Sequence, residues 1–86
     1  MKTIPVICYK VKNPVVYNQG TKWEKTCDTF LACYGCADVE RNKAYIDLLN
    51  TDDEARANFC ADHRLDPATI ECFYHYEQEP FDTRGD

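Results

Sequence analysis

The stretch that decides the fold is residues 3–17, Thr-Ile-Pro-Val-Ile-Cys-Tyr-Lys-Val-Lys-Asn-Pro-Val-Val-Tyr. Its first part, Thr3–Val11, is rich in β-branched and aromatic residues, which favours a strand. Val15–Tyr17 is a second β-prone run, and it leads into the Gly-containing turn Asn18-Gln19-Gly20-Thr21. β-prone runs around such a turn predict a hairpin. The N-terminal part of the chain is therefore expected to form a small antiparallel sheet of two or three strands.

Helical patterns follow this β-rich part. A capping signal at Cys27-Asp28-Thr29 precedes apolar residues at helical spacing that continue to Leu49, interrupted by Gly35. We expect one interrupted helix or two short ones over this span. Thr51 or Asp52 caps a further helix, and a last helix is expected over residues 67–76, after a cap and a Pro in its first position.

These elements predict an α+β fold in one domain, residues 1–86. An N-terminal antiparallel β-hairpin or three-stranded sheet is expected to pack on three or four α-helices. The β-rich part covers residues 1–26, the helical part residues 28–76, and a charged tail residues 77–86. Chains of this length have room for a single modest core.

Charge is divided unevenly along the chain. Residues 1–50 carry seven Lys and Arg against five Asp and Glu, whereas residues 51–86 carry three against ten. An acidic end of this kind repels nucleic acid and anionic membranes, and it attracts basic protein surfaces. We therefore expect a protein partner with a basic surface, no direct nucleic acid, no membrane, and a monomer or a homodimer.

The acidic end also carries aromatic residues, and this combination suits an interface in which charge steers the approach and aromatic rings supply affinity. The candidate partner-binding residues are Asp52, Asp53, Glu54, Asp62, Asp66, Glu71, Tyr74, Tyr76, Glu77 and Glu79. Carboxylates spaced along a helix can replace phosphates against a Lys/Arg groove. The charge pattern resembles that of small acidic phage or mobile-element inhibitors of the anti-restriction or anti-CRISPR type. The resemblance implies an inhibitor that occupies the nucleic-acid groove of a host machine.

Residues 59–73 resemble the helix-turn-helix segment of bacterial and phage regulators. The resemblance lies in the order of residue types in Phe59–Ile70. An apolar–small pair comes first, an aliphatic residue in the turn and a capping polar residue follow, and Thr with an aliphatic residue comes last. The resemblance implies a DNA-binding regulator as an alternative function. Two departures oppose it: Arg64 stands where the family usually has Gly, and no Lys or Arg lies between Pro67 and Gln78. Phosphate contacts supply much of the affinity for DNA, so a recognition helix without cations is unfavourable.

A zinc-stabilised structural or adaptor module is the other alternative. Both histidines lie three residues after a cysteine, so Cys60, His63, Cys72 and His75 would supply a chemically suitable tetrahedral set. Helical spacing places the second pair away from the apolar face of the expected last helix, which opposes a common site, and no metal or other cofactor is assigned. The pair Cys33 and Cys36 has the spacing of a redox dithiol but lacks the βαβ context.

Nothing in the sequence indicates an enzyme. The three glycines stand alone, so there is no Gly-rich phosphate loop, and the carboxylates are explained by a solvated face. The first residues lack the apolar stretch of about 7–15 residues that a signal peptide needs. We therefore expect a cytoplasmic protein, in the host cytoplasm if it is encoded by a phage, whose thiols stay reduced.

Overall fold

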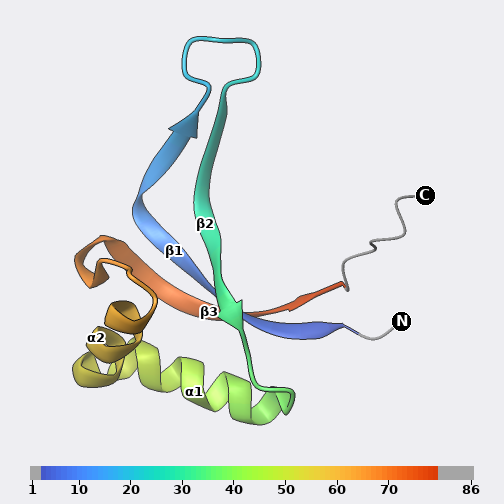
Figure 1. Cartoon of the computed structure of the whole chain (residues 1–86), viewed down its shortest axis with the longest axis vertical. Coiled ribbons are helices and arrows are strands. Elements are labelled where there is room, and N and C mark those ends of the chain that lie inside the picture. The colour runs from blue at the N-terminus through green and yellow to red at the C-terminus, as the bar shows by residue number, and fades with distance from the viewer. Residues whose placement is uncertain (1–2, 80–86) are drawn as a thin grey trace.

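The computed structural model describes residues 3–79 and shows an α+β fold (Figure 1). Its elements are β1 (Ile4–Tyr17), β2 (Lys25–Tyr34), α1 (Val39–Thr51), α2 (Asp53–Asp62), the 3-10 turn η1 (Pro67–Thr69) and β3 (Ile70–Gln78). The three strands form an antiparallel sheet in the order β2-β1-β3, so β1 is the central strand. Both helices lie on one face of this sheet.

The expected fold class and the N-terminal hairpin are confirmed, whereas the number of helices is wrong. The described residues contain two α-helices rather than three or four. The third strand of the sheet comes from the C-terminal part of the chain, next to the first residues of β1: Ile4 is paired with Gln78.

The helix expected from Cys27-Asp28-Thr29 is a second correction, because residues 25–34 form β2. The apolar residues Phe30 and Cys33 are compatible with both periods. Pairing with β1 decides the outcome, since it places the Phe30 ring beside Tyr9, with 5.7 Å between ring centroids. The helical part therefore begins at Val39 rather than at residue 28.

The last expected helix, residues 67–76, is also wrong. Asp66 does cap, since its side chain accepts from the backbone N–H of Ala68, but only the single turn Pro67–Thr69 follows. Residues 70–78 are then rich in Ile, Phe and Tyr, which favour a strand. They pair with β1 along an edge that β2 leaves open. The expected tail begins inside β3, and its residues 80–86 lie outside the described residues.

The core lies between the helices and the sheet. It contains Ile7 and Phe73 from the sheet, Ile46 and Leu49 from α1, and Phe59 and Cys60 from α2, together with Ile70. The Phe73 ring meets the Phe59 ring edge-on at 5.2 Å between centroids. Beyond this body, residues 12–28 form an arm that extends away from the helices (Figure 1).

Candidate functional site

The two helices and their flanking turns, residues 38–66, form an acidic layer. It contains eight Asp and Glu against four Lys and Arg, and all eight acidic residues are exposed. The acids are Asp38, Glu40, Asp47, Asp52, Asp53, Glu54, Asp62 and Asp66. The layer covers one face of the sheet, so its negative charge points away from the sheet.

Three of these carboxylates already have a structural role as helix caps. Asp38 Oδ1 accepts from the N–H of Glu40, at 3.0 Å, and Asp52 Oδ1 accepts from the N–H of Glu54, at 2.9 Å. Asp66 caps the 3-10 turn in the same way. Each side chain satisfies backbone donors that a helix start leaves free. These carboxylates are therefore partly committed to the fold.

Within the described part of the chain, the other acids of α2 have no internal counter-ion. Within residues 3–79 no Lys or Arg side chain forms an ion pair with a carboxylate, and the one His–carboxylate contact joins Nε2 of His75 and Oε2 of Glu77 at 3.3 Å. Asp53, Glu54 and Asp62 therefore offer their charge to solvent. Carboxylates in this state are available to a cationic partner surface.

The ten candidate partner-binding residues do not form one surface. Asp52, Asp53, Glu54, Asp62 and Asp66 belong to the acidic layer, and Glu71 borders a groove beside α2 that Asp53 also lines. Tyr74 and Tyr76 lie on the opposite face of the sheet, and Glu77 and Glu79 lie at the far end of β3. One flat partner surface cannot contact the tyrosines and the acidic layer together.

The sequence did not indicate a pocket between α1, α2 and the end of β2. It has a volume of about 390 Å³, and its lining includes Ile7, Cys33, Cys36, Arg41, Phe59 and His63. Its floor is apolar, and Arg41 and His63 contribute polar groups. The element that brings these residues together is the loop after β2, which has no sequence pattern of its own.

A buried polar network holds this loop against the sheet. Asn42 of α1 is 1 % exposed, and its Oδ1 accepts from the N–H of Cys36 at 3.0 Å. Its Nδ2 donates to Nδ1 of His75, at 2.9 Å, which places the His75 proton on Nε2, facing Glu77. Gly35 is required here, because a Cβ at this position would overlap the Asn42 side chain.

The proposed zinc set is not assembled. Cys60 is buried in the core, and His63 stacks on Phe59 with 4.1 Å between ring centroids. Cys72 and His75 are three residues apart on β3 and so point to opposite faces of the sheet. Among residues 3–79 no three or more His, Cys, Asp or Glu side chains are arranged to hold a metal ion.

All six cysteines are free thiols. Burial raises the pKa of Cys60 and Cys8, and it raises that of Cys33 with a further contribution from Cys8. A raised pKa keeps these thiols protonated at neutral pH, and the protonated thiol is a poor nucleophile. These three cysteines act as small apolar side chains.

In the segment that resembles a helix-turn-helix, residues 59–73, the structure has one helix end and a turn. α2 ends at Asp62 with His63 as its C-cap, Arg64 has a φ of 57°, and the N–H of Leu65 donates to the carbonyl of Cys60 at 2.7 Å. This is a Schellman helix end, with Arg64 at the position that usually holds Gly. The expected second helix is wrong, because η1 and β3 follow. The described residues offer no recognition helix after this turn.

The open face of the sheet, which no helix covers, has a different composition from the acidic layer (Figure 1). Strand pairing arranges nine of its residues in three rows across β2, β1 and β3, namely Tyr34–Val6–Tyr76, Leu31–Cys8–Tyr74 and Thr29–Lys10–Cys72. Lys10 is the only charged residue of the nine. Sequence reasoning missed this face because it placed β3 in a helix.

Comparisons with known proteins add no relative. No protein family, no curated protein and no solved structure matches this chain. In residues 3–79 the structure has no helix long and apolar enough to cross a membrane.

Proposed function

We propose that this protein is a small acidic binding protein whose acidic layer docks on a basic surface of a partner protein. The partner is a nucleic-acid-binding host machine, and docking occupies its nucleic-acid groove, as phage inhibitors of the anti-restriction or anti-CRISPR type do. The protein acts in the cytoplasm of the host.

The observation that carries this proposal is the state of the acids on α2. Asp53, Glu54 and Asp62 are exposed, and no ion pair within residues 3–79 neutralises them. Asp53 and Glu54 lie in the first turn and Asp62 at the end of a helix of 10 residues, which is about 15 Å long. Negative charge at both ends of a helix of this length suits an extended cationic surface better than it suits a small ligand.

Affinity capture from the native host, followed by mass spectrometry, tests the proposal. The wild-type protein is expected to retain a nucleic-acid-binding protein at low salt and to release it as salt rises, because exposed charges are screened over about 10 Å at 0.1 M. The triple variant Asp53→Asn/Glu54→Gln/Asp62→Asn is expected to lose most of this capture.

A matched control neutralises three exposed acids outside the acidic layer, in the variant Glu24→Gln/Glu77→Gln/Glu79→Gln. Its net charge equals that of the test variant, so a general charge effect would weaken both equally. Equal loss in the two variants, or capture that does not respond to salt, would contradict docking through α2.

A further inference from the structure

We propose that the open face of the sheet, together with the adjoining side of the arm, binds single-stranded nucleic acid. The occupant is a short stretch of DNA or RNA whose bases stack on exposed tyrosines and whose phosphates contact lysines. This proposal does not rest on the acidic layer, and it departs from the expectation that the chain avoids nucleic acid.

The first argument is the aromatic content of this face. Tyr34 and Tyr76 are 68 % and 54 % exposed, and pairing places them on either side of Val6. Tyr74 lies on the same face of β3, two residues before Tyr76, at a distance of about 7 Å along the strand. Exposed rings on a sheet are the platform on which single-stranded bases stack, because every base has a π-face.

The second argument is a groove on this face. It has a volume of about 320 Å³ and lies between Leu31 of β2 and the tyrosines of β3, with Cys8 of β1 among its lining residues. Leu31 is 49 % exposed, so this side of the groove is also apolar. The groove gives a flat ring a place between two strands.

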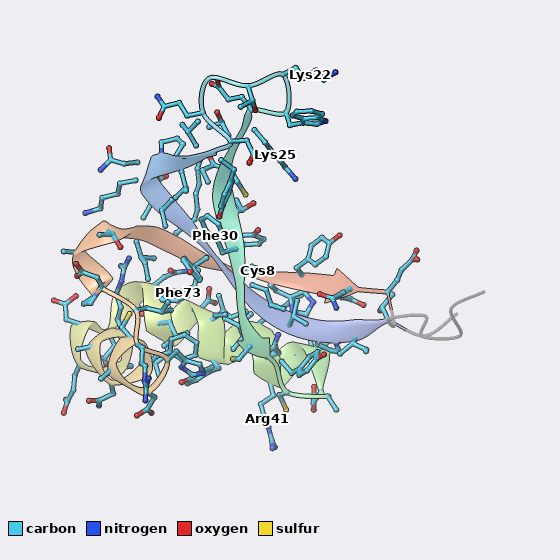
Figure 2. The ribbon with its side chains drawn as sticks, turned by 45° about the horizontal axis from the view of Figure 1, so that its top comes forward. Cys8, Lys22, Lys25, Phe30, Arg41 and Phe73 are labelled. Carbon is cyan, nitrogen blue, oxygen red and sulfur yellow. The ribbon has the colours of Figure 1, made fainter. Side chains whose placement is uncertain are left out.

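The third argument is charge. Lys10 lies in the third row, and the alternation of β2 carries the face onto the arm, where Lys25 is paired with Tyr17. Figure 2 shows Lys22 and Lys25 on the arm, away from Phe73 and the helices. The Lys22 ammonium lies 4.9 Å from the centroid of the exposed Trp23 ring. The tip of the arm thus holds a second group of lysines and aromatic rings, together with the carboxylate of Glu24, which accepts from the Gly20 N–H.

The acidic layer does not cancel this local charge. Its carboxylates lie on the far side of the sheet, and two packed layers are about 10 Å apart, which is roughly the screening length at 0.1 M salt. Asp28 of β2 is not part of this layer: burial raises the pKa of Tyr74, and the charge of Asp28 contributes to the same shift. Asp28 is therefore expected to weaken binding.

A second copy of this chain fits the face less well. If two identical faces met, Lys10 of one copy would find no acidic residue among the nine residues of the other face. The two Lys10 charges would instead repel each other, and like charges across an interface oppose association. An anionic partner with flat rings satisfies both the lysines and the tyrosines. Nucleic acid in single-stranded form has these two properties.

Fluorescence anisotropy tests the proposal with labelled oligothymidylate and oligouridylate of about 12 nucleotides, within the 4–16 that comparable platforms cover. At about 50 mM salt the wild type is expected to bind. Tyr76→Ala is expected to weaken binding at least about fivefold, because one base–aromatic stack contributes roughly 1–3 kcal/mol. Tyr76→Phe keeps the ring and is expected to retain binding.

Lysine variants separate phosphate contacts from general charge. Lys10→Gln and Lys25→Gln are each expected to reduce the slope of log K against log salt by about 0.7, the value for one phosphate contact on a single strand. Lys43→Gln, on the exposed side of α1, is the matched control and is expected to change nothing. Asp28→Asn is expected to tighten binding.

Three results would overturn the proposal. They are no anisotropy change with either probe at about 50 mM salt, equal binding by wild type and Tyr76→Ala, and a dimer in sedimentation that Tyr76→Ala dissociates. The last result would make the face an interface between copies. The α2 triple variant is expected to bind both probes as the wild type does, so failure of the proposed docking on a basic protein would leave this result unaffected.

Discussion

The two faces of β3 show how one strand serves two different surfaces. Phe73 points into the core and is 2 % exposed, whereas Tyr76, three residues later, points to the open face and is 54 % exposed. The sequence Phe-Tyr-His-Tyr does not distinguish these positions by hydrophobicity. The position of the helices determines which of these side chains is buried, because the helices cover one face of the sheet and leave the other to solvent.

The same division separates charge. The acidic layer, which packs on the covered face of the sheet, has eight carboxylates. The nine residues of the open face include one charged residue, Lys10. Five acids of the C-terminal part, Asp52, Asp53, Glu54, Asp62 and Asp66, thus lie on one side of the described molecule, and Tyr74 and Tyr76 lie on the other. This is why partner binding divides into two proposals.

The largest expected effect compares the two faces directly. Phe73→Ala removes a buried ring from the core and is expected to cost about 3–5 kcal/mol of the free energy of unfolding. Tyr76→Ala is expected to cost under about 1 kcal/mol, since its ring is mostly solvated. Urea unfolding monitored by circular dichroism measures both. Similar losses for the two variants would mean that the open face is covered.

The next effect concerns how the covered face is held together. Asn42→Ala removes the partner of the Cys36 N–H and of His75, and each buried group left without a partner costs roughly 1–3 kcal/mol. We expect a total loss of about 2–3 kcal/mol in the same unfolding assay. Asn58→Ala, at an exposed position of α2, is the control and is expected to lie within about 0.5 kcal/mol of wild type. A loss for Asn42→Ala no larger than this control would argue against the network.

A smaller effect of opposite sign is expected at the end of α2. Arg64 adopts a φ of 57°, and a residue with a side chain loses about 1–2 kcal/mol of conformational free energy there. Gly has no such strain, and its greater flexibility in the unfolded chain costs roughly 0.5–1 kcal/mol. Arg64→Gly is therefore expected to stabilise the acidic layer by up to about 1 kcal/mol in thermal unfolding. Arg64→Ala keeps the strained backbone and should show no such gain. A destabilised Gly variant would contradict this account.

The smallest expected effect is a pH dependence of the free energy of unfolding, which arises from Glu77 at the edge of the covered face. The hydrogen bond from Thr3, and then that from His75, holds the pKa of Glu77 below its ordinary value of 4.5. A carboxyl with a lowered folded pKa adds stability above 4.5, and this stability is lost as the pH falls through the folded value. Glu77→Gln should therefore be less stable than wild type at neutral pH and converge with it in acid. A constant difference would exclude Glu77 as the source.

Local signals in the sequence predicted some elements correctly. The hairpin turn and the cap at Asp52 are both present. Each depends on residues close together in the chain, namely a Gly in a turn and a carboxylate before a helix. The acidic layer follows from the same local information, since most of the acids lie on or beside the two helices.

The open face depends on pairing between distant residues. Val6 lies between Tyr34 and Tyr76, which are 42 residues apart in the chain, so no local sequence pattern predicts that these three residues are neighbours. Asp66 and Pro67 do start a helical turn, as their sequence signal predicts, but it ends at Thr69 and the following residues pair with β1. A strand that contains Ile, Phe and Tyr gains more from this pairing than from a marginal isolated helix.

The separation of the two faces is tested most directly by amide chemical shifts of the ¹⁵N-labelled protein during titration with oligothymidylate. The account predicts shifts in residues 27–34 of β2 and residues 72–78 of β3, and none in residues 53–66. Shifts concentrated in residues 53–66, or none anywhere in the described residues, would contradict it.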